Sequence, residues 1–354
     1  MPGPIFAADL SFDVPPSPAS SDSSFDEDDV NRRVTPYWQK YRCAFKFRGF
    51  QLDTVRDVKL FYQHQYSKGE TVSSRLFYPM PFSECRGEQG FINDDALCPD
   101  AGLPDNLFRG TRICDQKKFV AKAVHIYSRE YDVIRLLSQP PLNQNPMNHT
   151  IPVLDLFDIP EDQIAFIVME EWSSQLIPDS GPCCLRLFLA SLRQCIEHAL
   201  FMHMHHIAHL DISLRNLLTD YEGHYAYIDY ELSRRFDGVL DPLVQGYRGT
   251  EIPPECERGE CSDPYKIDIW ALGVLVLRAC KVNLPCRIFF TADPFRFFIQ
   301  LTGYNVPELM QLIRPMLHEE PRHRPPLSSV LRAFDRMVLS IGDSRLNATC
   351  SCSH

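Results

Sequence analysis

The chain has 354 residues, a hydrophobic fraction of 44% and a formal net charge of −10. Its length fits one large domain or two lobes, and its acidic balance excludes the basic surplus that nucleic-acid binding requires. No apolar run approaches the roughly 20 residues of a membrane span, so we expect neither a nucleic acid nor a membrane as partner.

The expected compartment follows from the N-terminus and the cysteines. The first ten residues contain no Lys or Arg and no long apolar run, so they do not have the pattern of a secretory signal. The 13 cysteines include no Cys-x-x-Cys pair and fit no zinc signature. We therefore expect reduced thiols in a cytoplasmic or nuclear protein.

The first half of the chain divides into a tail and a strand-rich lobe. Residues 1–35 are rich in Pro, Ser and acidic side chains, which predicts a disordered acidic tail. Residues 36–170 combine short apolar runs with loops and predict a small lobe, with an irregular, proline-containing insertion at 68–105. Four runs have the composition of strands: 107–113, 119–124, 151–157 and 165–169.

Helical patterns dominate the second half of the chain. A first helix is predicted before this half, after Ser128, which can cap its N-terminus. Apolar residues at helical spacing follow Ser128, and the helix ends before Pro140-Pro141. Residues 171–340 then contain long apolar stripes and predict a larger helical lobe, followed by a short polar tail at 341–354. Strands followed by helices predict two lobes of different composition.

The residues with the clearest chemistry lie in the segment His209-Leu210-Asp211-Ile212-Ser213-Leu214-Arg215-Asn216. An Asp and an Asn stand five residues apart in it, and Asp229 follows an apolar run 13 residues after Asn216. Phosphoryl transfer needs one carboxylate to orient the attacking hydroxyl, and a second carboxylate with an amide oxygen to hold Mg²⁺. Lys122, in the middle of a predicted strand, can reach phosphates if Glu130 pairs with it.

Taken in order, these segments resemble the motifs of protein kinases over most of residues 107–335. The resemblance implies an α+β, bilobal fold with a small antiparallel-sheet N-lobe and a larger, mostly helical C-lobe. The matching segments, besides His209–Asn216, are Val120–Lys122, the hinge Met169-Glu170-Glu171-Trp172, Asp229-Tyr230-Glu231, Pro253-Pro254-Glu255, Asp268–Gly273 and Pro321–Pro325.

The resemblance also implies a role for each matching residue. Asp211 would be the catalytic carboxylate, and Arg215 would neutralise charge on the transferred phosphate. Asn216 and Asp229 would hold Mg²⁺. The ATP-binding residues would be Lys122, Glu130, Met169, Glu170 and Trp172. The structural residues would be His209, Glu255, Asp268 and Arg324, with Glu255 and Arg324 joined in a mostly buried, bidentate ion pair. ATP and Mg²⁺ are the expected cofactors.

The sequence departs from the kinase pattern at three places. The Gly-rich phosphate loop is missing before Lys122, and Arg86–Phe91, which imitates half of it, lies too far upstream. Leu210 stands where an arginine usually receives an activation-loop phosphate, so we expect no switching by phosphorylation of the following segment. Glu231 replaces a glycine, which should disfavour a flipped inactive form.

Three functions stay open at this point. The first is a protein kinase that transfers the γ-phosphoryl group of ATP to a protein hydroxyl, of Ser/Thr or of Tyr. The second is a pseudokinase that acts as a binding module or scaffold, which the missing phosphate loop favours. The third is a small-molecule phosphotransferase of the aminoglycoside or choline kinase type, which Ile228-Asp229-Tyr230-Glu231 also matches. The motifs downstream of Glu231 favour a protein kinase.

Overall fold

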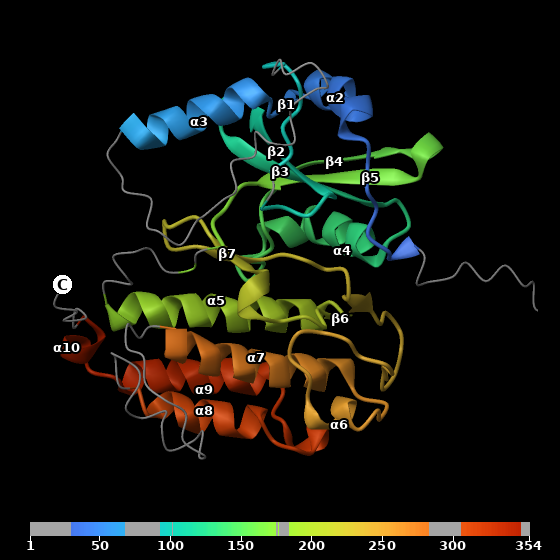
Figure 1. Cartoon of the computed structure of the whole chain (residues 1–354). Helices are drawn as coiled ribbons and strands as arrows, with labels where there is room; N and C mark the ends of the chain where they lie inside the picture. The colour runs from blue at the N-terminus through green and yellow to red at the C-terminus, as the bar shows by residue number, and fades with distance from the viewer. Residues whose placement is uncertain are drawn as a thin grey trace, which may run out of the picture.

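The computed structural model describes residues 30–67, 93–100, 102–174, 176, 184–282 and 306–347. It has a strand-rich lobe above a helical lobe (Figure 1), so the expected bilobal α+β fold is confirmed. A five-stranded antiparallel sheet with the spatial order β1-β2-β3-β5-β4 forms the centre of the upper lobe. Its strands are β1 (Phe50–Leu52), β2 (Leu107–Arg112), β3 (Lys118–His125), β4 (Val153–Ile159) and β5 (Ile164–Glu170).

Helices pack on both faces of this sheet (Figure 1). Helix α2 (Trp38–Phe47), which the sequence analysis missed, turns Trp38, Tyr41 and Phe45 toward an aromatic cluster that includes Phe166 of β5. Side chains alternate along a strand, so the next residue, Ile167, faces the other way, into the core that contains α4 (Arg129–Leu137). A further helix, α3 (Val55–Ser67), follows β1.

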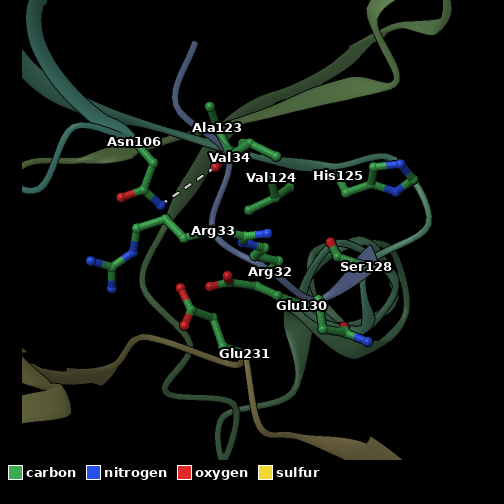
Figure 2. A pocket seen from close by; sticks show the side chains of 11 residues that line it. Arg32, Arg33, Val34, Asn106, Ala123, Val124, His125, Ser128, Glu130 and Glu231 are labelled. Atoms are coloured by element: carbon green, nitrogen blue, oxygen red, sulfur yellow. Dashed lines mark hydrogen bonds between the residues drawn. The ribbon is translucent and has the colours of Figure 1, made fainter. Parts of the chain in front are cut away.

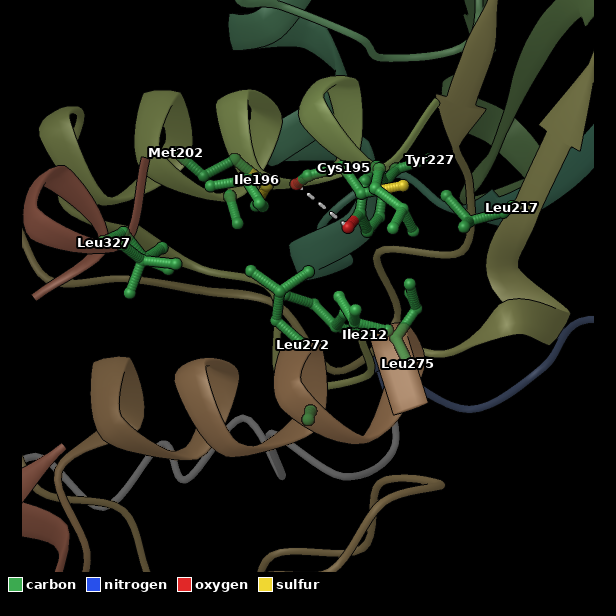
Figure 3. Close-up of a cluster of buried hydrophobic side chains, with 14 of the residues drawn as sticks. Cys195, Ile196, Met202, Ile212, Leu217, Tyr227, Leu272, Leu275 and Leu327 are labelled. Carbon is green, nitrogen blue, oxygen red and sulfur yellow. Dashed lines mark hydrogen bonds between the residues drawn. The ribbon is translucent and has the colours of Figure 1, made fainter. Parts of the chain in front are cut away.

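The helical lobe is built around α5 (Leu185–Met204) and α7 (Pro264–Val282). Their facing side chains, such as Ile196 and Leu272, are fully buried between the two helices (Figure 3), and Tyr227 donates a hydrogen bond to the Cys195 carbonyl at 3.2 Å. The other helices are α6 (Pro254–Glu257), α8 (Glu308–Met316), α9 (Leu327–Ser340) and α10 (Asp343–Leu346). Two small ribbons pair β6 (Ile207–Ala208) with β9 (Arg234–Arg235), and β7 (Leu217–Thr219) with β8 (Tyr225–Tyr227). The 3₁₀ turns span Leu142–Gln144, Pro160–Asp162, Leu214–Asn216 and Pro321–His323.

The connection between β1 and β2 is where the fold departs from the expected pattern. Strand β1 ends at Leu52, opposite Gly110, whereas β2 begins at Leu107, opposite Lys122. Residues 53–106, including α3, take the place of a short turn, so the insertion begins earlier than the expected 68. Arg86–Phe91 belongs to this connection in the chain but lies outside the described residues.

One of the scattered glycines has a packing role in the same pair of strands. A Cβ atom at Gly110 would lie 2.4 Å from the Gln51 carbonyl oxygen and 2.3 Å from the Phe119 ring. Only glycine lets β1 and the Phe119 ring approach β2 this closely.

Candidate active site

Lys122 of β3 lies at the centre of a buried group of charges. Its Nζ is 2.7 Å from Glu130 Oε2, 3.0 Å from Asp229 Oδ1 and 3.2 Å from Glu231 Oε1. The expected pair with Glu130 is therefore present, in the first turn of α4. Burial alone would lower the pKa of Lys122, but the carboxylates of Glu130, Asp229 and Glu231 outweigh it and raise this pKa, so the side chain is an ammonium.

Two residues cap the helix that carries Glu130. The Ser128 hydroxyl accepts a hydrogen bond from the Tyr131 backbone N–H at 3.3 Å, as the sequence predicted. Asn31 Oδ1 accepts a second one from the Arg129 backbone N–H at 2.8 Å. Asn31 falls within the segment 1–35 that was expected to be a disordered tail, so this part of the expectation is wrong, while residues 1–29 lie outside the described residues.

The carboxylate of Asp211 is held from two sides. Asp211 Oδ2 accepts a hydrogen bond from Asn216 Nδ2 at 2.7 Å, and Asp211 Oδ1 accepts one from the Thr250 backbone N–H at 2.6 Å. A third bond joins Asn216 Nδ2 to the Asp211 carbonyl oxygen at 2.9 Å. The exposed Arg215 lies in the 3₁₀ turn between them and makes no hydrogen bond or ion pair within the described part of the chain.

Asp268 on α7 fixes the start of the same loop. Its two carboxylate oxygens accept the backbone N–H groups of His209 and Leu210, both at 2.8 Å, and Oδ2 also lies 3.0 Å from His203 Nε2. Leu210 has a positive φ of 61°, a conformation that costs a branched residue free energy and persists only when surrounding contacts impose it. Asp268 provides such contacts and thereby orients the peptide before Asp211.

Tyr230 is anchored by partners that the sequence analysis missed. Its ring is fully buried, and its hydroxyl lies 3.0 Å from His198 Nε2 and 3.3 Å from Thr150 Oγ1. A buried tyrosine hydroxyl needs a hydrogen-bond partner. This requirement was the signal in the sequence that could have predicted a polar partner for Tyr230. The anchor holds the turn that presents Asp229, whose φ is 64°.

Leu210 packs where the resemblance would place an arginine. The side chain is 4% exposed and belongs to an apolar cluster with Phe236, Val244 and Ile267. Ser233, one of the hydroxyls in the segment after Asp229, is fully buried and donates to the His209 carbonyl oxygen at 2.9 Å. Apolar contacts thus join the segment after Asp229 to the loop that carries Asp211. Its independence of phosphorylation stays a prediction.

The expected hinge residues span the end of β5 and the two residues after it, between the lobes. Met169 and Glu170 are the last residues of the strand, and Trp172 Nε1 donates to Glu170 Oε2 at 3.1 Å. Two backbone hydrogen bonds of 2.9 Å between Ser173 and Thr219 then connect the hinge to the helical lobe. The hinge backbone therefore lies between the sheet of Lys122 and the loop of Asp211.

The expected pair of Glu255 and Arg324 is confirmed as a buried, bidentate contact. Nη1 and Nη2 of Arg324 each donate to a different oxygen of Glu255, both at 2.6 Å. The two side chains are 0% and 1% exposed.

The donor set at Asp229 and Asn216 suits a hard divalent cation. Asn216 uses its Nδ2 for Asp211, which leaves the amide oxygen as the atom for a metal, and Asp229 contributes a half-exposed carboxylate. Oxygen ligands of these types are the ones that Mg²⁺ prefers. The charged Lys122 thus contacts one possible metal ligand, Asp229, while the other, Asn216, contacts the positioned carboxylate of Asp211. A backbone hydrogen bond of 3.0 Å from Ile228 N–H to the Asn216 carbonyl oxygen connects the two pairs.

Comparison with known proteins agrees with this arrangement. The family model of the protein kinase domain matches residues 185–333. A Dictyostelium discoideum protein named as a probable serine/threonine-protein kinase is 25% identical over 244 residues, which cover 59% of this chain and 33% of that protein. The serine/threonine-protein kinase sck1 of Schizosaccharomyces pombe is 26% identical over 149 residues, 39% of this chain and 20% of that protein.

A third relative is viral. A protein of Acanthamoeba polyphaga mimivirus, named as a serine/threonine-protein kinase, is 28% identical over 166 residues, 44% of this chain and 58% of that protein. The chain thus matches between 20% and 58% of the length of these relatives. Within the described residues, no helix is long and apolar enough to cross a membrane. The matched domain, the names of these relatives and the bilobal fold support membership of the protein kinase superfamily.

Proposed function

We propose that the protein is an active kinase that transfers the γ-phosphoryl group of ATP to a protein hydroxyl. The observation that carries the proposal is a pair of contacts and the link between them: Lys122 contacts Asp229, and Asp211 contacts Asn216 within one loop. The Asn216 carbonyl oxygen accepts the Ile228 backbone N–H at 3.0 Å, which connects that loop to the residue before Asp229. Phosphoryl transfer depends mainly on positioning and charge stabilisation, and these four residues supply both.

Each residue has a distinct role in this proposal. Asp211 orients the attacking hydroxyl and accepts its proton. Arg215, which makes no hydrogen bond or ion pair in the described part of the chain, faces the transferred phosphate. Lys122, held by Glu130, contacts the phosphates, and the hinge at Met169, Glu170 and Trp172 holds the adenine. Bound to Asn216 and Asp229, Mg²⁺ would neutralise charge on the phosphates. Serine or threonine is the proposed acceptor, since the three relatives are named as serine/threonine kinases.

Two other functions compete with this one. A pseudokinase is favoured by the connection between β1 and β2, because residues 53–106, whose described part contains α3, separate two strands that a short glycine loop would join. The complete set of Lys122, Asp211, Asn216 and Asp229 disfavours it. A small-molecule phosphotransferase is disfavoured by the buried pair of Glu255 and Arg324, which belongs to the protein-kinase large lobe.

A comparison of two carboxylate variants tests the proposal. Asp229→Asn removes a metal ligand, so both Mg²⁺-dependent ATP stabilisation and phosphate transfer should weaken. Asp211→Asn leaves the metal ligands in place, so ATP stabilisation should survive while transfer falls by about two orders of magnitude or more. The measurements are thermal unfolding with millimolar MgATP and transfer to a generic protein substrate.

Asp343→Asn is the matched control, because this carboxylate is 87% exposed and lies on α10 in the helical lobe, away from the sheet of Lys122 (Figure 1). It should change neither quantity. Equal loss of stabilisation and transfer in both site variants would contradict the division of roles. A parent protein that is stabilised by ATP but transfers no phosphate would support the pseudokinase.

A further inference from the structure

The carboxylates around Lys122 carry more negative charge than its single ammonium can neutralise. One ammonium contacts three carboxylates, those of Glu130, Asp229 and Glu231, which lie within 4.8 Å of one another. Glu231 stands at a position where the resemblance implies glycine, so it adds a negative charge to this end of the site. The phosphates of ATP are also negative, and like charges in a partly buried site repel. Phosphate binding here calls for cations beyond Lys122 and the Mg²⁺ that Asn216 and Asp229 would hold.

The described strands of the sheet also show no Gly-rich loop at the end of β1, where such a loop would contact the phosphates. Strand β1 stops at Leu52, and residues 107–109 of β2 extend beyond it along β3 toward Lys122. A Gly-rich loop joining the two strands would supply backbone N–H groups to phosphates. Here residues 53–106 separate the two strands, and the described part of that connection contains α3.

A short basic segment from far upstream lies beside this position. Residues Asn31, Arg32, Arg33 and Val34 line a cavity together with Asn106, which immediately precedes β2, and with Glu130 and Glu231 (Figure 2). Arg32 and Arg33 are the only Lys or Arg residues among those lining it. Both side chains are exposed.

The segment is fixed at both ends. At one end, Asn31 Oδ1 accepts the Arg129 backbone N–H at 2.8 Å, which attaches it to the helix that carries Glu130. At the other end, Val34 packs against the aromatic cluster beneath α2. The two arginines between these anchors are therefore held near Glu130 and Glu231, with side chains long enough to reach into neighbouring space.

We propose that Arg32 and Arg33 form a phosphate strap, which supplies the cationic contacts to ATP that a Gly-rich loop would otherwise supply through its backbone. The strap rests on the proposed function, since ATP is its ligand. Guanidinium groups present planar pairs of N–H donors that match phosphate oxygens. Two such charges also offset the additional carboxylate of Glu231.

The test compares two ligands that differ only in phosphate. Binding of MgATP and of adenosine to the full chain is measured by isothermal titration calorimetry for the parent, Arg32→Ala/Arg33→Ala and Arg32→Lys/Arg33→Lys. The Ala pair should raise the dissociation constant of ATP about tenfold or more and change that of adenosine less than about twofold. The Lys pair keeps the charges and should lose less than the Ala pair, and salt should weaken ATP binding more steeply in the parent than in the Ala pair.

Arg314→Ala/Arg336→Ala is the matched control, because it removes two charges from exposed positions on α8 and α9. It should leave ATP binding unchanged. The strap is rejected if the Ala pair binds ATP as the parent does, or if its adenosine binding weakens as much as its ATP binding. It is also rejected if the control variant loses as much ATP affinity as the Ala pair. A parent that binds ATP without transferring phosphate rejects only the proposed kinase activity, because the strap is judged on binding. A parent that binds no ATP at millimolar concentration rejects both.

Discussion

The Arg324 guanidinium is fully buried, and each of its N–H groups has an acceptor. Besides the two bonds to Glu255, Nε donates to the His318 carbonyl oxygen at 2.9 Å and Nη1 to the Lys266 carbonyl oxygen at 3.0 Å. The remaining Nη2 hydrogen faces the Glu319 carbonyl oxygen at 3.4 Å. A buried charge with all donors satisfied joins α6, α7 and the turn before α9 at a single residue.

Removing this residue should therefore be costly. Arg324→Ala leaves the Glu255 carboxylate buried without a partner, and breaking such a pair typically costs about 3–5 kcal/mol. Arg324→Lys should also destabilise, because an ammonium cannot replace the bidentate contact. Urea unfolding measures the loss. Arg322→Ala, two residues away and 77% exposed, should change the free energy of unfolding by less than about 0.5 kcal/mol. A similarly small effect at Arg324 would contradict the role of the pair.

At the scale of elements, α4 depends on a contact from distant sequence. Asn31→Ala removes the acceptor for the Arg129 N–H and should lower the free energy of unfolding by about 1 kcal/mol, the usual cost of a lost cap. Asn31→Asp keeps an acceptor and adds a favourable charge near the helix N-terminus, so it should retain stability. Hydrogen exchange gives a local measure: the amides in the first turn of α4 should exchange faster in Asn31→Ala only. Unchanged exchange there would mean that Ser128 alone caps the helix.

The elements that sequence predicted are those with local periodicity. Strands β2 to β5 and helices α4, α5, α7 and α8 carry apolar patterns that determine their type before any packing is considered. Helix α2 was missed although Trp38, Tyr41 and Phe45 recur at helical spacing, because its face pairs with a sheet from elsewhere in the chain. The course of residues 53–106 was missed for a similar reason, since no local pattern specifies which strand neighbours β1.

The candidate site divides in the same way. Asp211, Asn216 and Asp229 lie close together in sequence, so their spacing was informative. The contacts that complete the site join distant segments: Asn31 with Arg129 across 98 positions, and His198 with Tyr230 across 32. Such contacts depend on how the two lobes and α5 pack, which residue spacing does not encode.

At the scale of the whole molecule, buried histidines link stability to pH. His198 and His209 are both almost fully buried, and burial lowers the pKa of each, that of His198 well below its ordinary value. The Nδ1 atom of His198 accepts the His149 backbone N–H at 3.0 Å, so its proton is on Nε2, facing the Tyr230 hydroxyl. A second proton, on Nδ1, would turn this atom from an acceptor into a donor that faces the His149 N–H, and the hydrogen bond between them would be lost. The folded protein therefore requires the neutral form.

The sign of the pH effect follows from these lowered pKa values. In the unfolded chain a histidine binds a proton near pH 6.5, whereas folded His198 stays neutral at this pH. The contribution of His198 to the free energy of unfolding is therefore complete above about pH 6.5 and is lost as the pH falls below it. Each such histidine contributes a slope of up to about 1.4 kcal/mol per pH unit in this window. Burial raises the pKa of Glu130 and of Glu251, which acts in the opposite direction. The informative quantity is therefore the difference between the parent and a His198 variant.

His198→Asn isolates that difference, because an amide oxygen can still accept the His149 N–H but does not titrate. Its free energy of unfolding, measured in urea at pH 7.5, 6.5 and 5.5, should fall less steeply than that of the parent, by about 1.4 kcal/mol per pH unit below 6.5. His206→Asn is the control, since His206 is exposed and its φ of 56° suits asparagine. It should keep the parent's slope. Parallel curves for the parent and His198→Asn would mean that His198 accepts a proton in the folded state, and the anchor of Tyr230 would then have to tolerate an imidazolium.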